Sequence, residues 1–181
     1  MAGKILTSLP LDIEENLLAL TNELRKMGVT HIGHGLIVGE LKPTAFFSCK
    51  DWAKRYDDED LVSRDPVRAC ALKTNFKVVP WEYIPSKKEQ KPVLEDRKHE
   101  FCAKNGILIS IKHKLFHETF VFGTDSNKQN VTDFFSENST ILINQLIMFR
   151  KEHMRYYSPS NNCGVDAKQW EQLSLHTDQI K

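Results

Sequence analysis

Residues 52–81 read WAKRYDDEDLVSRDPVRACALKTNFKVVPW, and this stretch sets two tryptophans and a tyrosine around an Asp-Pro step in a highly charged segment. Trp52 and Tyr56 are four residues apart, so one helical turn places both rings on the same face. Asp65 can cap a second helix that has Pro66 at its first position. Two interpretations follow. The rings anchor two helices to a core, or they line a pocket in which Asp65 accepts a hydrogen bond, because a carboxylate is costly to bury unpaired.

An amphipathic helix and a strand pair are predicted before this stretch. Residues 12–27 carry apolar side chains at steps of three and four, and Gly28 follows at the position of a C-terminal cap. The runs VTHIGHGLIV (29–38) and TAFFSC (44–49) are rich in residues that favour strands. The connection GELKP (39–43) between them has the glycine and proline of a hairpin turn, so the two strands are expected to pair.

Helices and strands alternate through the rest of the chain. Helices are predicted over 50–56, 65–73, 92–104 and 131–154, and strands over 76–80, 107–114 and 117–124. Because helices interrupt a small and mainly antiparallel sheet, the predicted fold class is α+β, an α/β/α sandwich with a central sheet of about five strands and helices on both faces. After Tyr157 the composition shifts to Ser, Asn, Gly and Pro, so we expect one domain over 1–158 and a linker or the start of a further domain over 159–181.

The composition excludes several classes of protein. The chain has 181 residues, and 25 Lys and Arg against 24 Asp and Glu give a formal net charge of +1. That balance lacks the basic character of a domain that grips nucleic acid by its phosphates. No run is long and apolar enough for a signal peptide or a membrane span, so a soluble, cytoplasmic protein with no membrane contact is expected.

Metal and enzyme chemistry are not favoured. Two histidine pairs invite a metal site, His31 with His34 and His113 with His117. Residues three apart in a strand point to opposite faces, and the second pair spans a predicted turn, so no metal site is expected. His99 and Cys102 resemble a base and a nucleophile, but on an amphipathic helix Cys102 is expected to face the core. The four cysteines are predicted to be reduced and mostly buried, and the chain is predicted to be neither an enzyme nor bound to a cofactor.

The combination of Trp52, Tyr56, Asp65-Pro66-Val67, Trp81 and Gly106 resembles the signature of the LuxR family's autoinducer-binding domain. Domains of this family sense N-acyl-homoserine lactones in bacterial quorum sensing. The order of predicted elements also agrees with the family's α/β/α sandwich. The resemblance covers roughly residues 10–158 of the chain.

The resemblance implies a role for each matching residue. The Trp52 indole N–H would donate to the lactone carbonyl, and Asp65 would accept the ligand's amide N–H. Tyr56 and Trp81 would pack on the acyl chain and the lactone ring, while Gly106 would serve the backbone at the entry to a strand. On this interpretation Asp65→Asn weakens ligand binding and spares the fold, because Asn caps a helix nearly as well as Asp.

Other positions match the family or depart from it. Val67 is expected beside the ligand and Pro66 is expected to start a helix. Ser48 stands where the family often has a second tyrosine, and Val121 stands where many members have Ser or Thr near the ligand. Both departures remove polar contacts from the amide end of a lactone, although both positions are still predicted to line the site.

The resemblance also sets the expected partners. The predicted ligand is a small amphipathic molecule such as an N-acyl-homoserine lactone. Family regulators read DNA through a C-terminal helix-turn-helix domain, so DNA contact is expected only through such a domain, which this chain lacks. The long last helix and the first helix offer more apolar surface than a small sheet covers, which predicts a homodimer. The alternative hypothesis is a ligand-free dimerisation or interaction module with a filled core.

Overall fold

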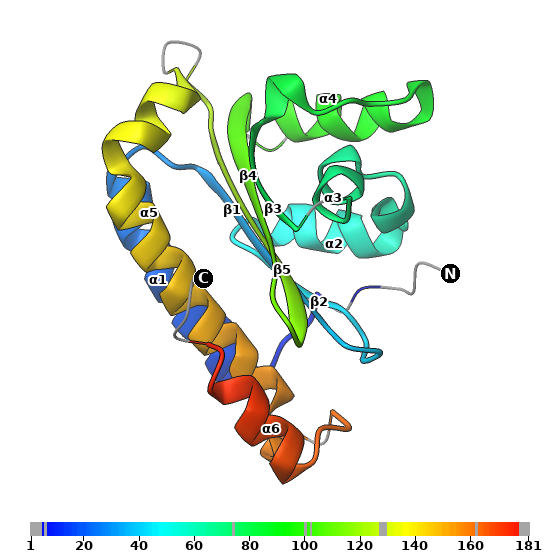
Figure 1. The fold of residues 1–181 in the computed structure, drawn as a ribbon. Coiled ribbons are helices and arrows are strands. Elements are labelled where there is room, and N and C mark those ends of the chain that lie inside the picture. Colours follow the sequence, from blue (N-terminus) through cyan, green and yellow to red (C-terminus); the bar gives the residue numbers. More distant parts are fainter. Residues whose placement is uncertain are drawn as a thin grey trace.

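A computed structural model describes residues 5, 7–73, 75–99, 101, 103–126, 130–161 and 163–177. Its centre is an antiparallel sheet with the strand order β2-β1-β5-β4-β3, five strands in the described part of the chain. The strands are β1 (His31–Val38), β2 (Thr44–Phe47), β3 (Phe76–Pro80), β4 (Asn105–Lys112) and β5 (Phe116–Thr124). Helices cover both faces of the sheet, which confirms the predicted α+β sandwich (Figure 1).

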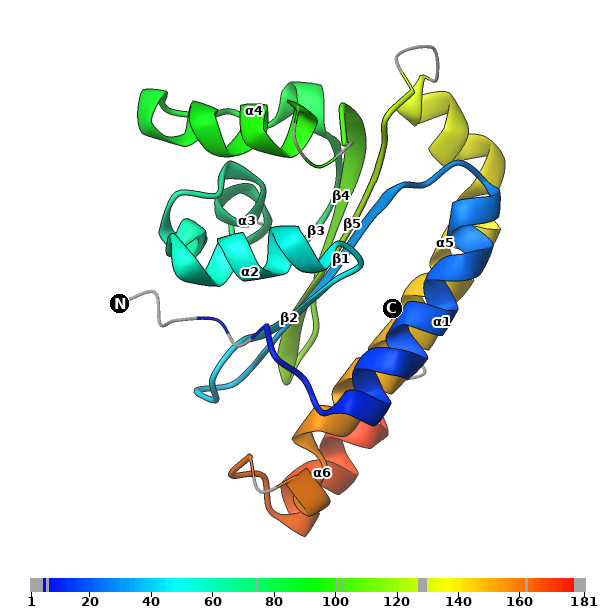
Figure 2. The ribbon, with the colours of Figure 1, turned by 180° about the vertical axis from the view of Figure 1, so that it is seen from behind.

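Two long helices, α1 (Leu11–Lys26) and α5 (Val131–Met154), lie side by side on one face of the sheet (Figures 1 and 2). The apolar stripe of α1 packs with that of α5 against alternate side chains of the strands, because side chains on a strand alternate between the two faces. Asn130 caps α5 by accepting hydrogen bonds from the backbone N–H groups of Thr132 and Asp133. This layer holds the largest hydrophobic cluster of the described residues.

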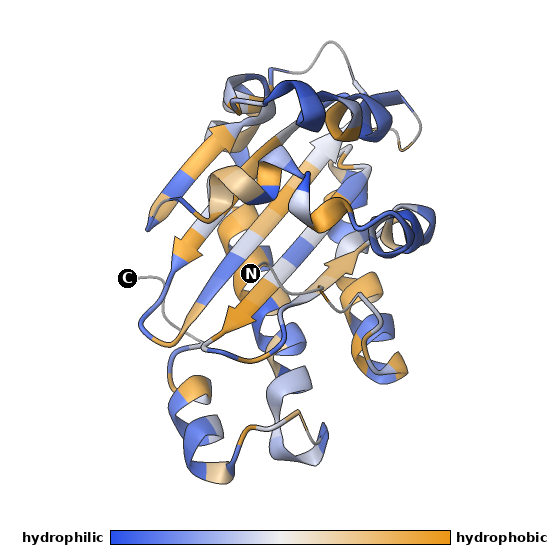
Figure 3. Cartoon of the chain, turned by 90° about the vertical axis from the view of Figure 1, so that its right-hand side faces the viewer, coloured by the Kyte–Doolittle hydropathy of each residue, from blue (hydrophilic) through white to orange (hydrophobic). Residues whose placement is uncertain are grey.

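Three short helices cover the opposite face. They are α2 (Lys50–Asp58), α3 (Pro66–Ala71) and α4 (Lys91–His99). Figure 3 views the chain from the side of these helices, and the strands behind them carry hydrophobic and hydrophilic residues in alternation. The helices are short and polar, and two separate clusters of buried residues lie beneath them. This layer leaves room for a cavity against the sheet.

A sixth helix, α6 (Ala167–Ser174), lies beyond the C-terminal end of α5 (Figure 1). Leu173 of α6 is buried in one cluster with Leu36 and Tyr157, and Arg150 of α5 donates to the carbonyl oxygen of Thr177 at 3.2 Å. Residues 163–177 therefore pack on the sandwich. The predicted division of the chain after residue 158 stays a prediction.

The predicted helix over 92–104 is too long. The helix α4 ends at His99, and Asn105 already begins β4. Asn105 and Gly106 favour the end of a helix, but here the backbone N–H of Ala103 bonds to the carbonyl of Arg97 and the chain then enters the sheet. No helix of the described residues is long and apolar enough to cross a membrane.

Candidate functional site

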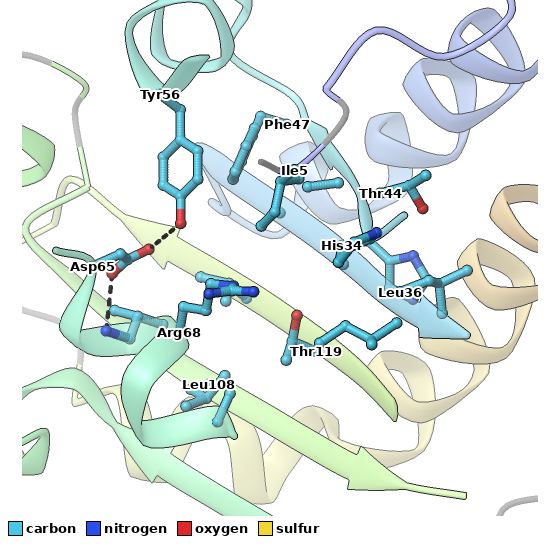
Figure 4. A pocket seen from close by; sticks show the side chains of 18 of the residues that line it. Ile5, His34, Leu36, Thr44, Phe47, Tyr56, Asp65, Arg68, Leu108 and Thr119 are labelled. Atoms are coloured by element: carbon cyan, nitrogen blue, oxygen red, sulfur yellow. Dashed lines mark hydrogen bonds between the residues drawn. The ribbon is translucent and has the colours of Figure 1, made fainter. Parts of the chain in front are cut away.

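A cavity lies between the sheet and the layer of α2, α3 and α4. Its volume is about 60 Å³, or about 640 Å³ when the gaps between the lining atoms and the solvent at the open mouth are counted. Gly33 and Gly35 of β1 form part of its floor and keep it low because they have no side chains. A Cβ atom on Gly35 would lie 2.7 Å from the Thr119 hydroxyl oxygen. Figure 4 shows the lining, with Ile5, Phe47 and Leu36 on one side and Asp65 and Arg68 on the other.

Asp65 lines the cavity and is almost fully buried. One carboxylate oxygen accepts the backbone N–H of Val67 at 2.9 Å, which caps α3. The other accepts the Tyr56 hydroxyl at 3.0 Å and Arg97 Nη2 at 2.9 Å. Burial, followed by the charge of Asp65, raises the pKa of Tyr56 well above its ordinary value, so the hydroxyl keeps its proton and donates. The carboxylate thus joins α2, α3 and α4.

Arg97 of α4 places its guanidinium among aromatic rings. Its central carbon lies 4.8 Å from the centroid of the Trp52 ring and 5.3 Å from that of Trp81. His31 of β1 meets both indoles edge-on, at centroid distances of 6.3 and 6.2 Å. We call this arrangement the Arg97 cage: the guanidinium with His31, Trp52 and Trp81 around it. Arg97 is only 2% exposed. Asp65 balances its charge, and cation–π contact with the rings stabilises the buried guanidinium further.

The Arg97 cage holds more hydrogen-bond donors than acceptors. The described residues supply no partner for the indole N–H groups of Trp52 and Trp81, for Nε and Nη1 of Arg97, or for Nδ1 of His31. Burial, together with the nearby charge of Arg97, lowers the pKa of His31 to about 3, so this imidazole is neutral at physiological pH. Buried N–H groups without partners are costly, which marks this part of the structure as a candidate binding site.

The structure brings four of the residues predicted from the sequence together. Trp52, Tyr56, Asp65 and Trp81 all lie around Arg97. Tyr56 and Asp65 line the cavity, whereas Trp52 and Trp81 contact the guanidinium and are not among the lining residues.

The remaining predicted residues have different positions. Val67 and Val121 line the cavity, and Pro66 is the first residue of α3. Ser48 is not among the lining residues. Its hydroxyl accepts the backbone N–H of Ile32 at 2.9 Å, which ties the end of β2 to β1.

Gly106 makes room for Trp81. A Cβ atom there would lie 2.6 Å from Cε2 of Trp81 and 2.7 Å from the carbonyl oxygen of Phe122. A Cβ atom on Gly123 of the neighbouring strand would lie 2.9 Å from the same ring. The two glycines therefore let the indole lie directly on the sheet.

Arg97 is the site residue that the sequence reasoning missed. It lies in the segment EDRKH, whose charges are typical of a solvated helix face. The sequence did contain one indication of its burial. Val93 lies four residues before Arg97, on the same face of the helix, and is also buried. An apolar residue one turn before Arg97 thus indicated that Arg97 lies on the inner face of α4.

A second buried polar cluster lies on the other face of the sheet. Glu118 accepts hydrogen bonds from Arg150 and, at 3.0 Å, from His113, while Nδ1 of His34 lies 2.9 Å from Nδ1 of His153. Burial alone would raise the pKa of Glu118, but the hydrogen bonds from His113 and Arg150, with His34 3.5 Å away, hold it below its ordinary value. Burial lowers the pKa values of His34 and His153. This cluster joins the sheet to α5 and is separate from the Arg97 cage.

The histidines and cysteines that were considered as metal ligands or catalytic residues lie in several separate places. His31 faces the Arg97 cage, whereas His34 faces Phe149 of α5, so this pair points to opposite faces as predicted. His117 bonds to the Ser110 hydroxyl, away from His113. His99 is exposed beside Glu95. Cys102 lies outside the described residues, and Cys49, Cys70 and Cys163 are free thiols.

No protein-family model matches the chain, and no curated protein matches it in sequence. Several solved structures share its fold. SdiA from Escherichia coli is 11% identical with a TM-score of 0.56, over 85% of this chain and 64% of SdiA. CepR2 from Burkholderia cenocepacia, an N-acylhomoserine lactone dependent LuxR family transcription factor, is 13% identical with a TM-score of 0.60, over 80% of this chain and 93% of CepR2.

A structure of SdiA in complex with octanoyl-rac-glycerol is also similar, at 12% identity and a TM-score of 0.55, over 82% of this chain and 62% of that one. The chain thus spans less than two thirds of the length of SdiA. Its fold is that of the autoinducer-binding domains of LuxR-family proteins, which confirms the resemblance at the level of fold.

Proposed function

We propose that the chain is a sensor domain that binds a small amphipathic molecule in the cavity between the sheet and α2–α4, like the N-acyl-homoserine lactone receptors of bacterial quorum sensing. The observation that carries this proposal is the partly open cavity whose lining includes the hydrogen-bonded side chains of Tyr56, Asp65 and Arg97. Apolar side chains suit an acyl chain, and a few convergent polar groups suit a head group. The fold shared with CepR2 and SdiA supports the same use of this cavity.

We further propose that the sensor is part of a cytoplasmic transcription regulator and acts as a homodimer. DNA contact would belong to a helix-turn-helix domain outside the 181 residues. The dimer is supported by apolar side chains that α5 presents to solvent, of which Ile141 and Met148 are each 46% exposed and lie seven residues apart on one face. Light scattering tests this part, and a monomer at high concentration would contradict it.

The second candidate is a ligand-free interaction module on the same fold. The position of Arg97 favours this module. Its guanidinium already donates a hydrogen bond to Asp65, whereas the family resemblance implies that Asp65 accepts the amide N–H of a ligand. In such a module the Asp65–Arg97 pair would be purely structural, and the protein would act through dimerisation or a protein partner.

Ligand-induced stabilisation separates the two candidates. The chain would be produced in bacteria that make no acyl-homoserine lactones, and its melting temperature would be measured with a panel of acyl compounds, because a ligand that binds only the folded state raises it. The matched control is Val121→Phe, which fills the cavity from its floor. The sensor predicts stabilisation of the parent and none of the control, whereas the module predicts none in either protein.

A further inference from the structure

We propose that the ligand of this cavity has an anionic, hydrogen-bond-accepting head group, a carboxylate on an apolar chain, and that Arg97 is the residue that selects it. This inference rests on the proposed sensor function and specifies its ligand class. It follows from three features of the site: the donors that lack partners, the charges of the lining, and the occupation of Asp65.

The first feature is the excess of donors. Nε and Nη1 of Arg97 and the indole N–H groups of Trp52 and Trp81 have no hydrogen-bond partner among the described residues, and all four atoms are buried. These groups donate and do not accept. Of these groups only those of Arg97 belong to a residue that lines the cavity, so a ligand oxygen there could accept from Arg97, whereas a ligand that supplies another N–H could not. Arg97 and His31 are the two members of the cage that line the cavity, so a head group bound there would contact them.

The second feature is charge. The described residues that line the cavity include two guanidinium groups, those of Arg68 and Arg97, and a single carboxylate, that of Asp65. Neutral histidines do not change this balance, so the lining has a net charge of +1. An anion with a single negative charge would bring the lining to neutrality. A carboxylate brings a full negative charge and two equivalent oxygens that can accept two N–H groups of one guanidinium, which favours it over an ester of the same shape.

The third feature is that Asp65 already has three donors. The backbone N–H of Val67, the Tyr56 hydroxyl and Arg97 Nη2 all point to its two oxygens. A ligand amide N–H that took the place of Arg97 would leave a buried guanidinium without a counterion. A carboxylate instead leaves the Asp65–Arg97 pair intact and uses the N–H groups on the rest of the guanidinium. The site therefore discriminates against amide donors and favours acceptors.

The test compares head groups on one acyl chain. Saturated carboxylic acids of medium chain length, their methyl esters, their primary amides and the matching acyl-homoserine lactones would be titrated into the parent chain below their micelle concentrations. Binding would be measured by calorimetry and by the shift in melting temperature. The acid should bind about tenfold more tightly than its ester, because its carboxylate can accept two N–H groups of the guanidinium, and one further hydrogen bond to a charged group is worth at least roughly that factor.

Two variants assign the preference to a residue. Asp65→Asn/Arg97→Gln removes both charges of the buried pair, so it buries no unpaired charge there. It should bring the acid and ester affinities close together, with only the charge of Arg68 left to favour the acid. Arg68→Gln removes the other guanidinium of the lining, whose charge no carboxylate of the lining balances, and should lower the ratio of acid to ester affinity without abolishing it. Val121→Phe again controls for binding outside the cavity.

Each outcome decides between the proposals. If esters, amides or lactones bind the parent as tightly as the acid, the sensor function stands and the carboxylate proposal is wrong. The same holds if the full acid preference survives in Asp65→Asn/Arg97→Gln or is abolished in Arg68→Gln. If no acyl compound binds the parent, or if Val121→Phe binds all of them equally well, the sensor function fails together with the inference that rests on it.

Discussion

Replacing Asp65 by Asn should destabilise the fold strongly, although Asn is as good a helix cap as Asp. The amide oxygen can still accept the N–H of Val67, so α3 keeps its cap. Arg97, however, is 2% exposed and would lose its counterion. Removing one partner of a buried ion pair costs about 3–5 kcal/mol. For a domain of this size each kcal/mol lowers the melting temperature by about 2–4 °C, so a decrease of roughly 6–20 °C is expected.

Urea unfolding of a double-mutant cycle gives the measurement. Asp65→Asn, Arg97→Met and the double variant would each be compared with the parent by their free energies of unfolding. The double variant should be more stable than Asp65→Asn, because it buries no unpaired charge and a Met side chain fills much of the space of Arg97. A loss below about 1 kcal/mol in Asp65→Asn, the amount typical of a cap alone, would refute the buried pair.

Three further predictions concern other parts of the fold. Gly106→Ala should lower the free energy of unfolding, measured with urea, by about 1–3 kcal/mol, because the new Cβ would overlap Trp81. The same change should cost less in a protein that already carries Trp81→Leu. Leu173→Ala should lower the free energy of unfolding by about 2–5 kcal/mol if α6 is an integral part of the domain. An unchanged midpoint, with faster amide exchange confined to α6, would show that this helix docks independently. The melting temperature should be constant above about pH 6.5 and fall below it, since His31, His34 and His153 have lowered pKa values when folded and the unfolded chain binds more protons. Each of these histidines contributes a slope of up to about 1.4 kcal/mol per pH unit, and a flat profile down to pH 5 would contradict their burial as neutral groups.

The fold was largely predictable because its long elements carry strong periodic patterns. The helix predicted over 131–154 has the same bounds in the structure, and β4 and β5 pair as the alternation of their residues indicates. The error was the end of α4. Asn105 and Gly106 are typical of a helix end, and only the pairing of Gly106 with Gly123 in the sheet shows that they begin a strand. Local signals do not contain that long-range contact.

The site was predictable in part, for a physical reason. Large aromatic residues are costly to expose to water, so their presence beside an Asp-Pro step in a charged segment indicates a buried or binding role. Trp52, Tyr56, Asp65 and Trp81 could therefore be identified from the sequence. Arg97 was missed, because a charged residue on a charged helix is exposed by default. Its burial depends on Asp65, which is 32 residues away in the sequence. The expectation that Asp65→Asn spares the fold is accordingly replaced by the large loss of stability predicted from this pair.

The buried pair also governs which ligand the cavity can accept. A head group that takes Arg97's place at Asp65 must compensate for breaking an interaction whose loss costs about 3–5 kcal/mol, which corresponds to roughly two to four decades of affinity. An acceptor that leaves the pair intact meets no such penalty and satisfies N–H groups of Arg97 that are otherwise unpaired. Stability and selectivity are thus two consequences of one contact. Variants that remove both charges should recover stability relative to Asp65→Asn and, in the same protein, lose most of the preference for a carboxylate.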